Sequence, residues 1–495
     1  MYSSIPLGVT MARPILILIS LICVAVSSYA QRTITLPKGT ELNLRLLADN
    51  VGYPASMTQG NDGYLWLTDR VSGNVLRVHP ITGVTTTVLT VDISVSPSDP
   101  NVRGGLYGIA LHPSFTTGTP IVFVTSTRVG DTLVVERYRF DGEKLIEPRR
   151  IFATGGVPLS QGLTLETLAD NTLLVSVGSY DNLDPNKMEN VNGKVIRMTF
   201  EGEAVPSNPH FSETFPKSAG SYIYTSGHRN PLGLVQVPPT SSVNAGVIYS
   251  TEMGPLSFDE VNRLEAGSNY GWLNIAGYCT SAPQGMKCPL ATMNQAPSGM
   301  AYYGSNAIPD WTNSLLIGTL RGRGLVVANL NEGGLVTNID ATRPSDDVMT
   351  LDEGQLIDLS LEGETERIMD VTVAQDGRVY AALYESGDAK RGRIVVLENP
   401  AVHNPTSVEG SDLAVSAGFS YGPNPARNEL RIRLDEASPS QWTVSVVDIK
   451  GRTMYSVEVA SSATEVLIPT ASLASGVYML VIKNESSTKT ATFSR

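Results

Sequence analysis

The sequence predicts an all-β protein, a six-bladed β-propeller followed by a small immunoglobulin-like β-sandwich. One signal, an Asp, Asn or Gly turn followed by an apolar strand, recurs at spacings of roughly 50 to 75 residues, which is typical of radially repeated four-stranded sheets. A large assembly of β-sandwiches is the alternative. No segment longer than about ten residues has a helical period, which argues against α/β folds. The copies are NDGYLWLTDR at 61, GTPIVFVTST at 118, ADNTLLVSVGS at 169, NAGVIYSTEMG at 244, WTNSLLIGTLRG at 311 and QDGRVYAALYESG at 375.

Composition and charge exclude several classes of partner. The 495 residues carry a formal net charge of -12, and no basic run occurs anywhere. Nucleic acid and anionic membrane surfaces are therefore not expected as partners. An apolar content of 41% with 45 glycines and 30 prolines describes a turn-rich globular chain with a real core.

The N-terminus reads as a secretory signal peptide over residues 1–30. Residues 12–30 run ARPILILISLICVAVSSYA, an apolar stretch that ends in small residues, with cleavage expected after Ala30. The run is short for a membrane span, so none is expected in the mature chain. Cys23 offers a lipoprotein alternative, but Ile22 stands where a small residue is wanted.

Two cysteines, Cys279 and Cys288, remain after removal of this leader. An even pair in an exported chain predicts a small disulfide loop. Unpaired thiols or half of a metal site are the alternatives.

The C-terminal quarter has a different composition. A propeller over 31–400 is followed by a proline- and serine-rich linker over 401–415 and a small sandwich over 416–495. PNPA, the turn from Asp448 to Arg452 and LASGVYML resemble the C-terminal sorting domain of type IX secretion. That resemblance implies recognition by the type IX secretion machinery and a secreted or surface-attached protein. A carbohydrate-binding sandwich is the alternative, but few aromatic residues are present to form its face.

Two glycine-punctuated motifs carry the strongest functional signal. GHRNPLG at 227–233 is followed by EMGPLSFDEVNRLEAGSNYGWLNIAGY at 252–278, and weaker markers include GGLYGIALHPSF at 104–115 and TLRGRG at 319–324. Together they resemble the soluble pyrroloquinoline quinone (PQQ) glucose and sorbosone dehydrogenases over roughly residues 45 to 397. The resemblance implies a six-bladed propeller that oxidises a sugar with PQQ and Ca²⁺.

The resemblance also implies which residues bind the cofactor. PQQ carries three carboxylates, and such a group needs several cations around it. Arg229 and Asn230 match cofactor-lining positions, Arg321 stands where the family has a lysine, and Arg367 matches the first of two family arginines. Met369 occupies the position of the second.

Calcium ligands follow from the same motifs. Main-chain oxygens of Gly254 and Pro255 match the cofactor-associated calcium site, which suits a hard cation. A second, structural calcium site would use the matching residues Glu260, Tyr270, Ala276 and Tyr278, although Thr280 replaces a following aspartate. The alternative is that Glu260 and its neighbour are solvated loop acids.

The catalytic base is the main departure from the family. The family's histidine falls on Ser160, and a serine hydroxyl cannot act unaided as that base. General bases contribute about 10² to 10⁴ in rate. Three hypotheses follow: a sugar oxidoreductase with a relocated base, a catalytically weak or inactive propeller that binds cofactor, calcium or carbohydrate, and a calcium-dependent lactonase.

Overall fold

The computed structural model describes residues 31–495 except for several loops. The gaps are 94–103, 129–131, 156–161, 180–183, 257, 278, 280, 339–355, 362–365, 386–390, 404–413, 417–418, 423–428, 435–440, 449–450, 461–464, 471–472, 474–475 and 485–487. The predicted signal peptide, Ser160, Tyr278 and most of the predicted linker therefore lie outside the described residues.

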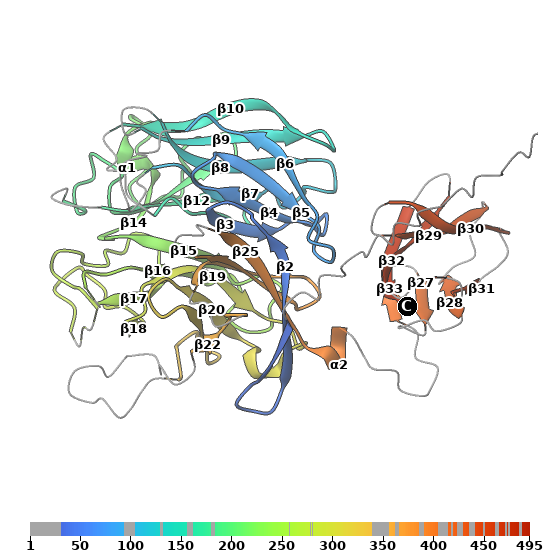
Figure 1. Cartoon of the computed structure of the whole chain (residues 1–495). Coiled ribbons are helices and arrows are strands. Elements are labelled where there is room, and N and C mark those ends of the chain that lie inside the picture. The colour runs from blue at the N-terminus through green and yellow to red at the C-terminus, as the bar shows by residue number, and fades with distance from the viewer. Residues whose placement is uncertain are drawn as a thin grey trace, which may run out of the picture.

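Six antiparallel sheets arranged around an axis form the larger body, which confirms the predicted six-bladed propeller (Figure 1). The first strand of each sheet packs against the first strands of the two neighbouring sheets, and this ring encloses the axis. From the axis outward, the first three sheets are β3 (Pro54–Gln59), β4 (Leu65–Asp69), β5 (Asn74–Val78), β6 (Thr85–Thr90); β7 (Leu106–Leu111), β8 (Ile121–Arg128), β9 (Thr132–Phe140), β10 (Leu145–Thr154); and β11 (Leu165–Thr167), β12 (Thr172–Val177), β13 (Lys194–Thr199), β14 (Ile223–Ser226).

The other three sheets complete the ring. They are β15 (Pro231–Gln236), β16 (Ile248–Glu252), β17 (Asp259–Leu264), β18 (Ala291–Met293); β19 (Pro297–Tyr303), β20 (Ser314–Thr319), β21 (Gly324–Asn329), β22 (Ile357–Asp358); and β23 (Arg367–Val373), β24 (Val379–Tyr384), β25 (Gly392–Glu398), β2 (Glu41–Asp49), β1 (Gln31–Thr35). Among the residues that the structure describes, helices are limited to short pieces, α1 (Ala219–Tyr222), the 3-10 turn η1 (Pro309–Trp311) and α2 (Pro400–His403).

The six strand signals found in the sequence all fall on the second strand of a blade, namely β4, β8, β12, β16, β20 and β24. This strand has a neighbour on both sides and sheets above and below it, so nearly all of its side chains are buried. A turn residue with positive φ precedes the strand in blade after blade, for example Gly63 at 80° and Gly377 at 85°. The continuous burial of each strand and the left-handed turn residue before it are the two features that allowed these strands to be predicted from the sequence.

The hydrophobic core lies between the sheets. Six clusters of buried side chains occur in the propeller, one at each interface between neighbouring blades. The ring is closed by β2, which comes from the N-terminal end of the chain and pairs with β25 from the C-terminal end, with Leu44 opposite Leu397.

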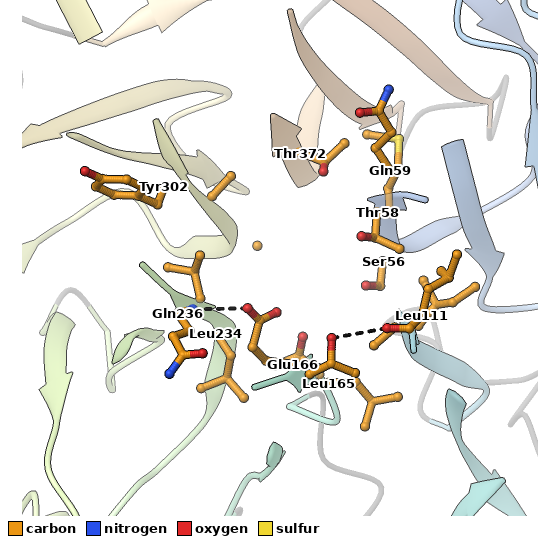
Figure 2. Close-up of a pocket in the computed structure, with 18 of the residues that line it drawn as sticks. Ser56, Thr58, Gln59, Leu111, Leu165, Glu166, Leu234, Gln236, Tyr302 and Thr372 are labelled. Atoms are coloured by element: carbon orange, nitrogen blue, oxygen red, sulfur yellow. Dashed lines mark hydrogen bonds between the residues drawn. The ribbon is translucent and has the colours of Figure 1, made fainter. Parts of the chain in front are cut away.

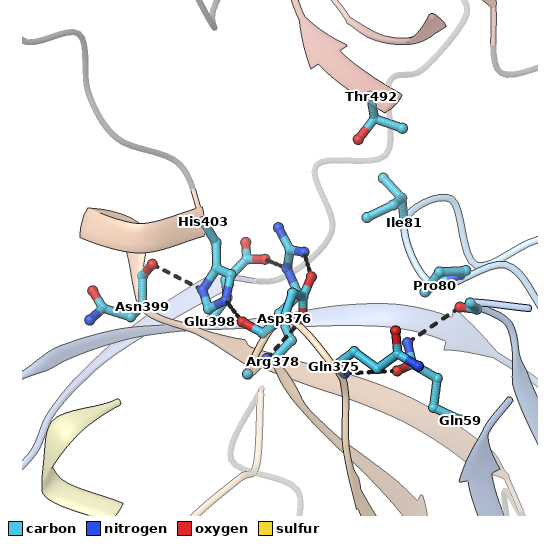
Figure 3. Close-up of polar contacts among 12 residues, drawn as sticks. Gln59, Pro80, Ile81, Gln375, Asp376, Arg378, Glu398, Asn399, His403 and Thr492 are labelled. Carbon is cyan, nitrogen blue, oxygen red and sulfur yellow. Dashed lines mark hydrogen bonds and ion pairs between the residues drawn. The ribbon is translucent and has the colours of Figure 1, made fainter. Parts of the chain in front are cut away.

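At the end of the propeller, beside α2, a group of polar side chains is joined by hydrogen bonds and ion pairs (Figure 3). Arg378 donates from Nε to Glu398 at 2.9 Å and also pairs with Asp376. His403 contacts the main-chain oxygens of Asn399 at 3.1 Å and Asp376 at 3.0 Å. These contacts attach α2 to the sixth blade before the chain continues to the C-terminal domain.

The C-terminal domain is the predicted small sandwich. One sheet contains β26 (Ala414–Ser416), β27 (Phe419–Gly422), β28 (Glu429–Leu434) and β31 (Glu465–Pro469), and the other contains β30 (Thr453–Val459), β29 (Trp442–Asp448), β32 (Val477–Lys483) and β33 (Thr488–Ser494). A separate cluster of buried side chains lies between them. The predicted turn is present, since Asp448 Oδ1 accepts the Arg452 N–H at 2.9 Å.

The predicted disulfide is also present. Cys279 and Cys288 are bonded, with their Cα atoms 5.3 Å apart. The loop that they close follows β17 on the fourth blade.

Closure of the ring by β2 is testable through Leu44, which is 0% exposed and packs between the fifth and sixth blades. Leu44→Ala is expected to lower the free energy of unfolding by about 2 to 5 kcal/mol, because it leaves a cavity in a packed interface. Urea unfolding followed by tryptophan fluorescence measures the change. Leu335→Ala, at a side chain that is 51% exposed, is the control and should stay within about 0.5 kcal/mol of the parent. Equal effects of the two substitutions would contradict the closure.

Candidate functional site

The predicted site residues lie at one face of the propeller, where the first strands begin. Asn230 directly precedes β15, and Arg367 is the first residue of β23. Arg321 follows β20, whose end is paired with the start of β19 through Thr319 and Pro297. The first strands of all blades run in the same direction along the axis, so these loops lie on the same face. They do so although 138 residues of sequence separate Arg229 from Arg367.

The loop that contains Arg229 is held by a buried carboxylate that the sequence argument had not singled out. Glu252, the last residue of β16, is 3% exposed. Its Oε1 accepts the backbone N–H groups of Arg229 and Asn230, and its Oε2 lies 2.9 Å from His228 Nδ1. The Glu252 side chain thus fixes the start of β15 through two backbone N–H groups and one imidazole.

His228 is an orienting residue in this loop. Its ring is fully buried, stacks on Tyr270 with centroids 4.9 Å apart, and has Nε2 2.9 Å from Thr225 Oγ1. A histidine with both nitrogens engaged and no exposure is poorly placed to act as a base for a substrate.

Arg229 turns its guanidinium onto main-chain oxygens. Nη1 donates to Met253 O at 2.8 Å and to Gly254 O at 3.0 Å, and the guanidinium carbon lies 5.4 Å from the centre of the Trp272 ring. The carbonyl of Gly254, one of the predicted calcium ligands, therefore already accepts a cationic donor.

Arg321 reaches the same loop from the fifth blade. Its Nη2 donates to Leu256 O and its Nη1 to Asn294 Oδ1 at 3.1 Å. Two guanidinium groups therefore bind the segment 253–256, whose carbonyls point outward. The fold therefore brings Arg229 and Arg321 to the same segment of chain.

Arg367 lies at the same face on the sixth blade, in a different environment. It is half-buried and stands opposite Tyr384, whose ring packs at a tilt against that of Tyr53, with centroids 3.9 Å apart. Its neighbour Met369 lines a small cavity on the axis. None of Arg229, Arg321 and Arg367 lines this cavity, although Leu320 and Met369, which are close to two of them in the chain, do.

Three acids lie beneath the segment 253–256. Asp259 is fully buried and accepts the backbone N–H of Gly254 at 3.0 Å and of Ala296 at 2.7 Å. Glu260 stands opposite Glu252 across the two strands and accepts the Gly277 N–H at 2.8 Å. Burial, and then the charge of Glu252, raise the pKa of Glu260 above its usual range. The sequence alternative of solvated loop acids is therefore wrong for Asp259 and Glu260.

Part of the predicted second calcium site gathers around Glu260. Ala276 is half-buried beside Glu260, Pro255 and Tyr270, while the Tyr270 hydroxyl accepts the Glu265 N–H at 3.0 Å. Two polar atoms nearby, Ser250 Oγ and Asn262 Oδ1, are buried without a hydrogen-bond partner among the described residues. A buried carboxyl with a raised pKa beside two unsatisfied oxygens suits a hard cation.

A channel runs along the axis and contains two further acids. Its wider part has a volume of 460 Å³ and opens at the face away from the arginines. Figure 2 shows Glu166 among the side chains that line it. Glu166 of β11 and Asp370 of β23 line it from opposite sides of the ring. Burial raises the pKa of each carboxyl to about 7, and the charge of Asp370 adds to the shift at Glu166. The sequence argument had no signal for this pair, because each acid stands alone in a short inner strand.

No described histidine takes the place of the missing base. His112 and His79 each accept backbone N–H groups of the turn that follows them, at the far face from Arg229. Ser160 itself lies outside the described residues, but Ser179, at the end of the next strand, donates its backbone N–H to Arg229 O at 2.6 Å.

Comparison with known proteins agrees with this geometry. Residues 51–396 match the family model for glucose/sorbosone dehydrogenase. The chain belongs to the glucose/sorbosone dehydrogenase family. Residues 421–494 match the secretion system C-terminal sorting domain, so the family's propeller is joined here to a sorting domain.

Individual relatives of this family member give the same picture. An uncharacterised protein of Synechocystis, slr1608, is 31% identical over 71% of this chain and 85% of its own length. Quinoprotein glucose dehydrogenase B of Acinetobacter calcoaceticus is 28% identical over 49% of this chain, and the match spans about half, 54%, of that relative. The PQQ-bound aldose sugar dehydrogenase of Streptomyces coelicolor is 26% identical, with a TM-score of 0.56 over 74% of this chain and 98% of its own.

Two further observations bear on ligands and membranes. In the part of the chain that the structure describes, no three His, Cys, Asp or Glu side chains gather into a metal-binding group. No described helix is long and apolar enough to cross a membrane.

The buried carboxyl of Asp370 makes stability depend on pH. Its pKa is about 7 when folded, above the value of about 3.9 for a free Asp, so the folded protein retains a proton that the unfolded chain releases. This contribution is complete below about pH 4 and is lost as the pH rises through 7.

Asp370→Asn is therefore expected to flatten the fall in unfolding free energy between pH 4 and 8, even though the loss of one accepted hydrogen bond lowers the absolute value. Urea titrations across that range measure the slope. Asp141→Asn is the control, because this exposed turn acid has a lowered pKa and its small effect has the opposite sign. An unchanged slope for Asp370→Asn would show that the channel acid is ionised throughout.

Proposed function

We propose that this chain is an exported, PQQ- and calcium-dependent oxidoreductase that oxidises a hydroxyl or hemiacetal carbon of a sugar. The observation that carries the proposal is the convergence of Arg229 and Arg321 on one loop at the mouth of a propeller that belongs to the sugar dehydrogenase family. Planar guanidinium groups bind carboxylates through paired N–H donors, and PQQ offers three carboxylates.

In this proposal Arg229, Arg321 and Arg367 bind the carboxylates, and Asn230 contributes its side-chain amide. Asn230 is 1% exposed and its Oδ1 is buried without a hydrogen-bond partner among the described residues, so a polar group is missing beside it. When bound, PQQ supplies the acceptor for the two electrons that leave the sugar carbon as hydride. Glu252 orients the loop, because it fixes the backbone of Arg229 and Asn230.

Calcium is proposed at the two places where the described residues offer oxygen. Main-chain oxygens of Gly254 and Pro255 would hold an ion associated with the cofactor. Glu260, Tyr270, Ala276 and Tyr278 would hold a structural ion, with the unsatisfied oxygens of Ser250 and Asn262 close by. Ionisation of Glu260 is unfavourable in the ion-free protein, and a divalent cation would offset that cost.

The step that removes the sugar hydroxyl proton has no established base in this chain. Ser160 stands at the base position, and a missing general base raises the barrier by roughly 3 to 5 kcal/mol. The loss of that base favours a second candidate function, a weakly active or inactive propeller that binds cofactor, calcium or carbohydrate.

One experiment separates the two candidates. The full chain without its leader is mixed with PQQ and Ca²⁺, and cofactor absorbance is recorded together with sugar-dependent reduction of a dye. Binding with reduction supports the oxidoreductase, and binding without reduction supports the second candidate. Absence of cofactor binding rejects both forms of the quinoprotein proposal.

Location follows from the sorting domain. The proposal is that the mature protein crosses the outer membrane through the type IX machinery and is then released or held at the cell surface. Detection of the protein inside cells that lack this secretion system, and outside cells that have it, would test the assignment.

Arg229→Gln is expected to weaken PQQ binding by about 10-fold or more, because a charge-assisted hydrogen bond contributes about 1.5 to 3 kcal/mol. Calcium affinity measured without PQQ should stay the same or rise, because the guanidinium no longer occupies Gly254 O. Absorbance titration and calorimetry measure the two affinities. Arg149→Gln, which removes an exposed ion pair with Glu201, is the control. An unchanged PQQ affinity would remove Arg229 from the site.

Ser160→His is expected to raise sugar-dependent turnover, by up to about 10² to 10⁴ if the imidazole reaches the sugar hydroxyl. Steady-state dye reduction measures the gain in kcat. Ser160→Gln has similar bulk without a base and serves as the control. Flat kinetics in the histidine variant would mean that the sugar pocket differs from its relatives beyond this residue.

A further inference from the structure

Arg70 is a buried arginine at the cofactor face that neither the motifs nor the comparisons assign. It follows β4 in the turn between the second and third strands of the first blade and is 4% exposed. Its backbone is fixed on both sides, since its N–H donates to Tyr53 O at 2.8 Å and its carbonyl accepts the Leu106 N–H at 3.1 Å. A side chain at Gly105 would lie 2.2 Å from Arg70 O, so the neighbouring loop is packed directly against it.

The guanidinium of Arg70 is positioned by two tyrosine rings. Nε donates to Gly104 O at 3.1 Å and Nη2 donates to the Tyr107 hydroxyl at 3.2 Å. The guanidinium carbon lies 4.9 Å from the Tyr107 ring centre and 5.6 Å from that of Tyr53. Cation–π contacts with these two rings help to fix the position of the guanidinium.

This cluster extends across the closure of the ring to Arg367. The Tyr53 ring packs at a tilt against Tyr384, and Tyr384 is the cross-strand neighbour of Arg367 in the sixth blade. Arg70 and Arg367 therefore flank the channel mouth on one side, while Arg229 and Arg321 lie on the other side, around the loop 253–256.

Arg70 also lines the narrow end of the channel. A cavity of 50 Å³ lies there on the axis, and Met369 lines it as well. This volume exceeds the ~30 Å³ that a water molecule occupies in the liquid, so a carboxylate-sized group fits.

Arg70 and Asp370 are the charged side chains on the described lining. Asp370 directs its oxygens to the backbone N–H groups of Met57 at 2.7 Å and Val371 at 2.8 Å, into the strands. Arg70 is therefore the cation that this cavity offers to a ligand.

We propose that Arg70 binds a carboxylate of the ligand held at the channel mouth, in the region where Met369 supplies no charge. The carboxylate belongs either to the quinone cofactor or to an acidic sugar. The inference rests on the proposed function, because it takes the cofactor face as the ligand site.

The test compares two ligands that differ only in whether their carboxyl groups are charged. PQQ and its trimethyl ester are titrated by absorbance into the parent and into Arg70→Gln. The variant is expected to lose about 10- to 100-fold in affinity for PQQ and to keep its affinity for the ester within about twofold. Arg70→Lys, which keeps the charge without the fork, should lose less with PQQ and nothing with the ester. Equal losses for acid and ester would show that Arg70 only supports the loop, and no loss with any ligand would overturn the proposal.

Arg77→Gln is the matched control. Arg77 is in the same blade, lies 3.4 Å from the Tyr64 ring centre and pairs with Asp62, but at the opposite face. Arg77→Gln should change neither the affinity for PQQ nor the affinity for the ester. Thermal melting of each variant identifies the folded fraction used in the titrations.

The second arm replaces the cofactor by sugars. Glucose and glucuronate are titrated by tryptophan fluorescence into the parent and into Arg70→Gln. A loss confined to glucuronate assigns the carboxylate to the substrate, and a loss confined to PQQ assigns it to the cofactor. If the parent binds no PQQ, the proposed function fails, and the Arg70 inference then stands only if glucuronate binding depends on this residue.

Discussion

Closure of the ring by β2 is the constraint on which the site depends. Pairing of β2 with β25 joins the two ends of the propeller chain. The inner strands then form a closed ring in which all of them run in the same direction along the axis. Loops that precede the first strands, and turns that follow the second strands, must then emerge at one face. Arg70, Arg229, Arg321 and Arg367 come from four different blades and meet there only because of this closure.

Charge at that face is arranged in two layers. Carboxylates of Glu252, Asp259 and Glu260 are buried below and accept backbone N–H groups, which sets the path of the loops. Guanidinium groups of Arg229 and Arg321 lie above and donate to the outward carbonyls of the segment 253–256. Buried acids are costly unless they are paired or hydrogen-bonded, so the same groups that stabilise the loops leave an environment that favours cations.

On the proposed function, this face supplies the cations for a polyanion, and four arginines and one buried asparagine lie on it. Ser160 and Met369 stand at two positions where the family resemblance predicts a histidine and an arginine. Binding a rigid cofactor requires charge and shape, which many loops contribute, whereas proton transfer depends on one side chain within hydrogen-bond reach. Loss of a single residue affects the second property much more than the first.

The sequence predicted the fold because the second strand of every blade is buried on all sides and follows a turn residue with positive φ. The disulfide and the turn at Asp448 were predicted from residues close together in the chain, whereas the sorting domain was predicted from the resemblance of three short motifs spread over residues 423–480. The positions of Arg229 and Arg321 were predicted through motif resemblance. Their actual contacts were not, because a motif gives the residue but not the atoms that its guanidinium meets.

What the sequence by itself determined is therefore local: strands, turns, the paired cysteines and the loops with their charges. Tertiary structure alone decided that Glu252 fixes the Arg229 loop, that Glu166 faces Asp370 across the channel, and that Arg70 joins the cofactor face. These pairs are separated by 23, 204 and about 160 residues or more of chain, respectively, and come from strands that carry no shared pattern. Their proximity results from the closed circle of blades, which is a property of the whole chain and not of any segment within it.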